Sequence, residues 1–209
     1  MRDFSNDHSA LAINSATVKT LDLKGLVDGC ARAGITAIAP WRDQIQAVGI
    51  SQAGRMIRDA GLKVTSLVRA GLFTAADEAG RKAAIEDNRR ALDEAAEIGA
   101  ANLLLIAGGL PPGSKDVAGA RQQVRDGLAA LLPHAREAKM PLALEPLHPM
   151  TAADRGCVTT LGNANDICEE LGEGIGVAID VEIFSANNWW KRNPDEVLRI
   201  CIERFRSVV

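Results

Sequence analysis

The sequence predicts an incomplete (β/α) barrel, and two observations support this prediction. First, short apolar segments alternate with helical patterns six times along the 209 residues, an alternation typical of parallel sheets with crossover helices. Second, polar or bulky residues recur where the predicted strands end, as expected where function lies at the carboxyl ends of barrel strands. Because a complete barrel has eight units and about 250 residues, this chain is short by one or two units.

Each element follows from its local pattern. The segments expected to be strands are residues 10–16, 35–41, 62–68, 102–108, 141–147 and 176–184. The segments expected to be helices are residues 23–34, 51–61, 77–99, 116–138, 160–172 and 194–209. Four glycines that directly follow or end predicted helices are expected to terminate them: Gly34, Gly61, Gly99 and Gly172.

A barrel is favoured over a doubly wound sheet because no strand leads into a glycine-rich phosphate loop. The segment 107–114, AGGLPPGS, is rich in glycine. Its two prolines, however, cannot donate backbone hydrogen bonds to a phosphate group. A nucleotide-binding sheet is therefore not expected.

Composition and charge exclude several classes of function. The net charge is −3 and the pI is about 5.7, and no basic stretch indicates a nucleic-acid partner. No run of about 18 apolar residues indicates a membrane span. The polar start of the chain and the irregular spacing of its four cysteines predict a cytoplasmic protein with reduced, mostly buried thiols.

Carboxylates lie at the ends of two predicted strands. Asp180 and Glu182 are two positions apart, so an extended strand would place them on one face, and Glu145 lies near the end of the preceding strand. A carboxylate on an inward face is costly unless it is neutralised. Oxygen ligands from neighbouring strand ends would suit Mg²⁺, Mn²⁺ or Co²⁺. Contacts with arginine or backbone groups at the barrel rim would suit the spacing equally well.

Several segments resemble the xylose isomerase-like TIM-barrel family, in particular its sugar phosphate isomerases/epimerases. The most specific are EPLHPM followed by ADR, and EIFSANNWW. The segments AINSATV, APWRD and LIAGGLPPGS also match, whereas GVAID is less specific. The resemblance runs along the whole chain and implies a TIM barrel of the xylose isomerase-like type.

The resemblance also implies a site for one divalent metal ion with four ligands at strand ends. Glu145 matches the glutamate after the fifth strand, Asp180 the aspartate after the sixth, and Glu182 the glutamate of the eighth. The histidine that follows the seventh strand in the family has no match here. Glu145 and Glu182 also match the pair of catalytic carboxylates. With only carboxylates matched, the expected metal is Mn²⁺ or Mg²⁺, with Co²⁺ as a further candidate.

The segment 176–190 joins a match to the sixth strand directly to a match to the eighth. The sixth helix, the seventh strand and the histidine ligand of the family have no counterpart between them. We therefore expect a single domain over residues 1–209 with about six units, and an internal deletion whose junction lies around Val181.

Four other residues are candidates for contacts with substrate. His148 and Arg155 could bind a substrate hydroxyl or oxyanion, or could instead cap loop backbone and pair with a loop acid. Trp41 could form an apolar wall under a sugar ring, or could plug the mouth of the barrel. Asn14 could hydrogen-bond to substrate or satisfy backbone groups of its loop.

The function implied by the resemblance is isomerisation or epimerisation of a small sugar or sugar phosphate. A proton next to a carbonyl would be removed to give an enediolate. An inosose dehydratase-type lyase with the same metal site is an alternative. An inactive remnant with a binding or structural role is another, because one ligand is missing, and the sequence leaves open whether the chain is an enzyme. Unpaired strand edges in a shortened barrel also predict a homo-oligomer, most simply a dimer.

Overall fold

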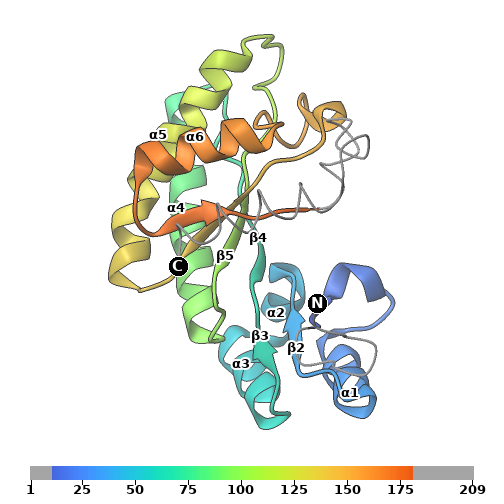
Figure 1. Cartoon of the computed structure of the whole chain (residues 1–209). Coiled ribbons are helices and arrows are strands. Elements are labelled where there is room, and N and C mark those ends of the chain that lie inside the picture. Colours follow the sequence, from blue (N-terminus) through green and yellow to red (C-terminus); the bar gives the residue numbers. More distant parts are fainter. Residues whose placement is uncertain (1–10, 181–209) are drawn as a thin grey trace, which may run out of the picture.

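The structure is a computed structural model that describes residues 11–180, in which helices pack around parallel strands (Figure 1). The strands are β1 (Ile13–Asn14), β2 (Ala37–Ala39), β3 (Lys63–Val64), β4 (Leu67–Gly71), β5 (Leu103–Ile106), β6 (Leu142–Glu145) and β7 (Ile175–Val177). The α-helices are α1 (Leu23–Ala33), α2 (Arg42–Val48), α3 (Ile50–Asp59), α4 (Glu78–Glu97), α5 (Val117–Glu137) and α6 (Leu161–Leu171). Two short 3₁₀ helices are η2 (Ser15–Val18) and η3 (Pro149–Thr151).

The strands are all parallel and follow one another in chain order. They pair as β1-β2-β3 and as β4-β5-β6-β7. Isolated bridges join the two groups, one from Trp41 to Val68 and one from Val64 to Ala100. The described strands therefore form one continuous parallel arc, which confirms the prediction of an incomplete parallel α/β barrel.

The strand predicted at 62–68 is divided in two, because this segment changes partners. Its first part, β3, pairs with β2, and its second part, β4, pairs with β5. At the crossing, the Asn102 side chain donates a hydrogen bond to the carbonyl oxygen of Thr65 at 3.0 Å. The Leu67 amide then donates to the carbonyl oxygen of Asn102. β3 and β4 thus make up the strand of a single β/α unit.

The helices cover one side of the arc. Successive helices contact one another, α1 with α3, α3 with α4, and α4 with α5. Alternate residues of β5 and β6 differ in burial, as one covered face requires. The fully buried set is Leu103, Leu105, Leu142 and Leu144, and the half-buried residues between them are Leu104 and Ala143. This single layer of helices is the arrangement of a barrel and not that of a doubly wound sheet.

Helix α2 was not predicted, because its seven residues carry little apolar periodicity. Ile45 is its one buried residue, and Gly49, with a φ of 92°, separates α2 from α3. Several strands are also shorter than predicted, and the first is reduced to Ile13–Asn14 followed by η2. The four glycines expected to end helices all have positive φ, which confirms their role: Gly34, Gly61, Gly99 and Gly172.

The cysteines behave as core residues. Cys30 and Cys157 are buried and Cys168 is partly buried, and all three are free thiols. Burial raises the pKa of Cys168 to about 12, so this thiol stays protonated near neutral pH. Cys201 lies outside the described residues, as does the helix expected at 194–209. No helix in residues 11–180 has both the length and the apolar character needed to cross a membrane.

Asn88 anchors α4 to the carboxyl end of β4. Its side chain is fully buried, accepts a hydrogen bond from the Gly71 amide at 2.5 Å and donates to the Gly71 carbonyl oxygen at 2.7 Å. Gly71 has a φ of 101°, and a Cβ atom there would lie 1.9 Å from the Ile106 carbonyl oxygen. Only glycine therefore fits where β4 turns beside β5.

Replacing Asn88 should destabilise the domain strongly. In Asn88→Ala both backbone groups of Gly71 lose buried hydrogen-bond partners, so we expect the free energy of unfolding to fall by about 2–3 kcal/mol. Urea denaturation followed by circular dichroism measures this change. Asn165→Ala, on a partly exposed position of α6, is the matched control and should change the stability by less than about 0.5 kcal/mol. Equal losses in the two variants would contradict the anchoring role.

Candidate functional site

The carboxyl edge of β6 and β7 brings together two of the predicted site residues. Glu145 is the last residue of β6, where it pairs with Ile106 of β5. β6 also pairs with β7, and the Ala178 amide still donates to the Leu144 carbonyl oxygen at 2.9 Å. Ala178, the residue directly after β7, therefore lies beside Glu145, and Asp180 follows two residues later. In an extended chain that spacing places Asp180 on the same face as Ala178.

The positions below these carboxylates are small. One row before Glu145 and Ala178, Ala143 pairs with Gly176 across β6 and β7. Glu145 is half-buried and Asp180 is exposed. Small neighbours leave space near the carboxylate oxygens for a hydrated cation. Within residues 11–180, however, no three histidine, cysteine or acidic side chains are grouped so that they could hold a metal ion. Glu182, the third expected ligand, lies outside this range.

Asn14 and Trp41 come from different strand ends and meet directly. The Trp41 indole Nε1 donates a hydrogen bond to Asn14 Oδ1 at 2.8 Å, and the same oxygen accepts from the Ala16 amide at 2.9 Å. The Trp41 amide donates to Ser15 Oγ at 3.0 Å. In this structure Asn14 therefore fixes the indole ring and caps η2.

His148 and Arg155 both lie in the loop after β6. His148 Nδ1 accepts a hydrogen bond from the Met150 amide at 3.1 Å, so the imidazole caps η3. Arg155 is 63% exposed and lies 3.6 Å from Asp154, which is the contact with a loop acid described above. Backbone bonds from Gly108 to Arg155 and from Cys157 back to Gly108 tie this loop to the one after β5. The structure thus shows the backbone-capping and loop-acid contacts for these two residues.

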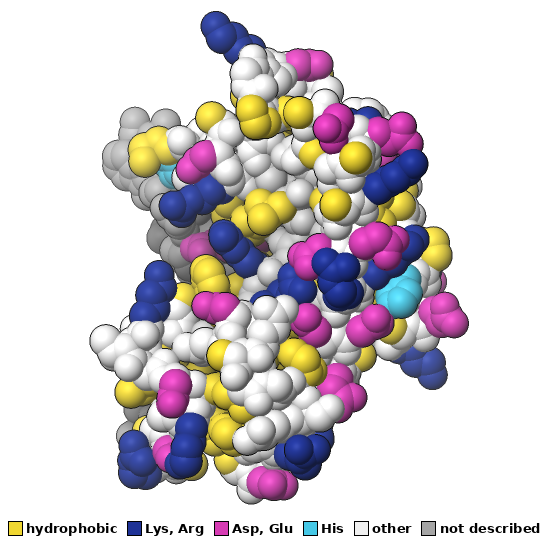
Figure 2. Space-filling view, turned by 180° about the vertical axis from the view of Figure 1, so that it is seen from behind, with side chains coloured by type: hydrophobic (Ala, Val, Ile, Leu, Met, Phe, Trp, Pro, Cys, Tyr) yellow, Lys and Arg dark blue, Asp and Glu magenta, His cyan; other side chains and the backbone are white. Residues whose placement is uncertain are grey.

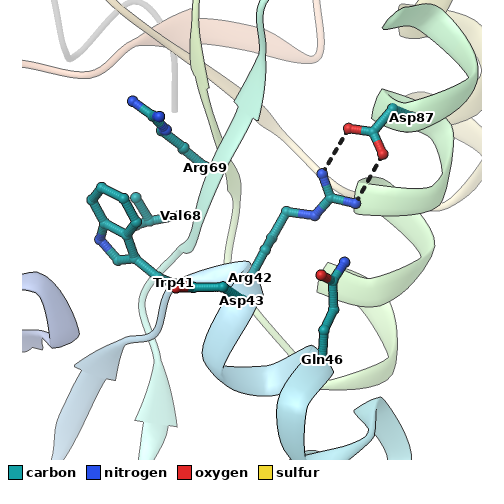
Figure 3. Close-up of a pocket in the computed structure, with 7 residues that line it drawn as sticks. All are labelled: Trp41, Arg42, Asp43, Gln46, Val68, Arg69 and Asp87. Atoms are coloured by element: carbon teal, nitrogen blue, oxygen red, sulfur yellow. Dashed lines mark hydrogen bonds and ion pairs between the residues drawn. The ribbon is translucent and has the colours of Figure 1, made fainter. Parts of the chain in front are cut away.

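A pocket of about 390 Å³ opens near the ends of β2 and β4 (Figure 3). Trp41, Val68 and Arg69 lie along one side of it. Arg42 extends across towards Asp87 on α4, and the remaining lining residues are Asp43 and Gln46. The sequence indicated Trp41 as a site residue but gave no role to Arg69. Arg69 directly follows the strand predicted at 62–68, and this position could have indicated a site residue.

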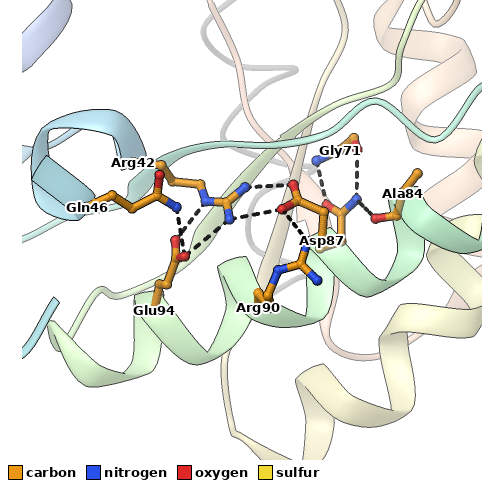
Figure 4. A network of polar contacts seen from close by, with 8 residues as sticks. Arg42, Gln46, Gly71, Ala84, Asp87, Arg90 and Glu94 are labelled. Atoms are coloured by element: carbon orange, nitrogen blue, oxygen red, sulfur yellow. Dashed lines mark hydrogen bonds and ion pairs between the residues drawn. The ribbon is translucent and has the colours of Figure 1, made fainter. Parts of the chain in front are cut away.

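Arg42 is the centre of a network of ion pairs that joins α2 to α4 (Figure 4). Its guanidinium donates to Glu94 at 2.7 Å and to Asp87 at 2.8 Å. Burial alone would lower the pKa of Arg42, but hydrogen bonds with Glu94 and Asp87 outweigh it and raise that pKa. The hydrogen bond from Arg42 in turn holds the pKa of Asp87 below its usual value. The Asp87 carboxylate therefore stays ionised near neutral pH, and the ion pairs of Arg42 give the network a structural role.

Most of the chain matches one family model. The family model described as xylose isomerase-like TIM barrel matches residues 27–206. The chain therefore belongs to the xylose isomerase-like TIM-barrel family, and its fold is the incomplete barrel expected from the sequence. No curated protein is similar enough to this chain to count as a match.

Solved structures share the fold. The crystal structure of protein SMc04130 from Sinorhizobium meliloti 1021 is 60% identical with a TM-score of 0.82, and the match covers 84% of this chain and 64% of that one. D-psicose 3-epimerase, crystallised in the presence of D-fructose, is 15% identical with a TM-score of 0.71, covering 83% of this chain and 64% of that one. The IOLI protein, crystallised with a zinc atom, is 18% identical with a TM-score of 0.71, and the match covers 83% of this chain and 63% of that one. The chain thus spans less than two thirds of each of these proteins.

Removing Arg42 should destabilise the link between α2 and α4. Arg42→Met leaves the Glu94 carboxylate, whose side chain is 15% exposed, without its guanidinium partner, and we expect a loss of about 2 kcal/mol in the free energy of unfolding. Arg90→Met is the matched control, because the Arg90 side chain is 65% exposed and surface pairs contribute about 0–1 kcal/mol. Urea denaturation of both variants tests this. A loss in Arg42→Met no larger than that in Arg90→Met would show that the network does not stabilise the fold.

Proposed function

We propose that this protein has the site of a divalent-metal-dependent isomerase or epimerase of small sugars or sugar phosphates, with weak turnover in this chain. The observation that carries the proposal is the register of β6 and β7. It sets Glu145 beside Ala178, two residues before Asp180, at the carboxyl edge where barrel enzymes hold their chemistry.

The residues at this edge suit a hard cation. Glu145 and Asp180 supply carboxylate oxygens from neighbouring strands, and Ala143 and Gly176 below them take up little space. Glu182 is proposed as the third ligand. Carboxylate ligands favour Mn²⁺ or Mg²⁺, and also Co²⁺, over Zn²⁺, which more often has thiolate or imidazole ligands.

In this proposal Glu145 acts as the base. Its carboxylate takes the proton from the substrate carbon next to the carbonyl, and Glu182 would return a proton to the opposite face in an epimerase. A bound cation supplies Lewis acidity that polarises the carbonyl and acidifies that proton. Loss of a β-hydroxyl after the same proton abstraction gives the lyase alternative.

Weak turnover follows from the proposed deletion around Val181. Without a counterpart of the family's seventh strand, the site would lack a histidine ligand and one wall that excludes water. In an extended chain, Glu182 would approach the substrate from the same side as Asp180, which is two residues away. Because a misplacement of about 1 Å can cost 10²-fold in rate, proton return to the opposite face is expected to be slow.

A second candidate function is a binding or structural role without catalysis, because the histidine ligand of the family has no match in this sequence. A homodimer is part of either proposal. Among the described strands, β1 and β7 each pair on one side only, and such edges need covering by a partner chain or by a loop.

Solvent exchange of a substrate proton distinguishes the two candidates. With Mn²⁺, we expect slow uptake of deuterium next to the carbonyl of a small ketose or inosose, followed by NMR spectroscopy, and loss of that uptake in Glu145→Gln. Glu137→Gln, at an exposed position on α5, is the matched control and should exchange like the unmodified chain. The Sinorhizobium meliloti protein should exchange at least about 10²-fold faster.

Two results would overturn the enzymatic proposal. One is exchange that is unaffected by Glu145→Gln. The other is the absence of exchange from both this chain and the Sinorhizobium meliloti protein, which would leave the binding role.

A further inference from the structure

Arg69 is a positive charge at the pocket that forms no ion pair with another described residue. It lies within β4, its side chain is exposed, and its guanidinium carbon lies 5.3 Å from the centroid of the Trp41 ring. Among the ion pairs of residues 11–180, none involves Arg69. The Lys19 ammonium group also approaches the Trp41 ring, at 5.9 Å. Two cations thus meet one indole at the edge of the pocket.

The other charged residues of the pocket do not cancel this charge. Arg42 and Asp87 neutralise each other within the network on α4. Asp43 lines the pocket but makes no ion pair with Arg69 in the described structure. On the face of the molecule shown in Figure 2, basic and acidic side chains are interspersed, with no broad field of one sign.

Trp41 gives Arg69 a fixed support. The indole is held by its hydrogen bond to Asn14 Oδ1 at 2.8 Å, and its backbone by the bond to Ser15 Oγ. A guanidinium stacked on an aromatic ring keeps its N–H edge free for a planar or tetrahedral oxyanion. Arginine binds carboxylate and phosphate groups through two parallel hydrogen bonds, which makes it the side chain suited to this task.

Arg69 lies on the same side of the sheet as the carboxylates. Ala70 pairs with Leu105 on the helix-covered side, so the adjacent Arg69 projects from the opposite side, and Figure 3 shows it directed away from α4. Gly71 is level with Ile106, and Ile106 with Glu145. Arg69 is therefore two strands and two residues from Glu145, roughly 10 Å across the sheet and 7 Å along it. One small sugar derivative held by a long arginine side chain can span that distance.

We propose that Arg69, supported by Trp41 and assisted by Lys19, binds the anionic group of an acidic sugar, either a carboxylate or a phosphate. That the ligand is a sugar rests on the proposed function. That the ligand carries an anionic group rests on the residues of the pocket. The inference makes Arg69 a specificity-determining residue that favours charged substrates over neutral ketoses.

Calorimetric titration in the presence of EDTA tests anion binding independently of any metal. The probes are D-glycerate, glycerol 3-phosphate and, as the uncharged counterpart, glycerol. We expect one or both anions to bind and glycerol not to bind. Arg69→Gln should weaken anion binding at least about tenfold, because a hydrogen bond from a charged group contributes about that much to the affinity. Arg69→Lys should fall between the two, because it keeps the charge and loses the two-point contact.

The matched control is Arg55→Gln, an exposed arginine on α3, which should bind like the unmodified chain. Preference for glycerate or for glycerol phosphate tells which anion the site takes. Equal binding by Arg69→Gln and the unmodified chain, or no binding of either anion, would overturn the inference. Anion binding without any proton exchange would support the inference and contradict the proposed function. Proton exchange on neutral ketoses without anion binding would support the proposed function and contradict the inference.

Discussion

The alignment of β5, β6 and β7 is the constraint on which the candidate site depends. Leu103, Leu142 and Ile175 form one row across the three strands, and all are buried against the helices. A slip of one residue would turn this row away from the core and the carboxylates towards the helices. Burial of apolar side chains on one face therefore determines where Glu145 lies on the other.

Two polar contacts hold the opposite part of the rim. Asn88 binds both backbone groups of Gly71, and this fixes the end of β4 against α4. Arg42 joins α2 to the same helix through Asp87 and Glu94. Because both contacts meet on α4, this helix links α2, which follows Trp41, to the end of β4. Arg42 and Asp87 thus have a structural role, whereas Arg69 forms no ion pair within the described residues.

The sequence predicted the parallel arc because helix and strand periods alternate clearly and glycines mark the helix ends. It also placed Glu145 and Asp180 at neighbouring strand ends, since both follow strand-like segments. It did not predict α2, which has one buried apolar residue and is joined to α4 by the long-range network of Arg42. Nor did it predict the division at Thr65, which depends on a side chain from Asn102, 37 residues away. The partnerships of Trp41 with Asn14 and Arg69 likewise join segments far apart in sequence, which local patterns cannot reveal.

The central claim is that Glu145 and Asp180 share one divalent cation, and a double-mutant cycle on Mn²⁺ affinity tests it most directly. Electron paramagnetic resonance measures free Mn²⁺ in titrations of the unmodified chain, Glu145→Gln, Asp180→Asn and the double variant. If both carboxylates hold one ion, each single change weakens binding at least about tenfold, and the double change costs clearly less than the sum of the two. Mn²⁺ affinities that are unchanged in either single variant, or strictly additive losses, would contradict a shared site.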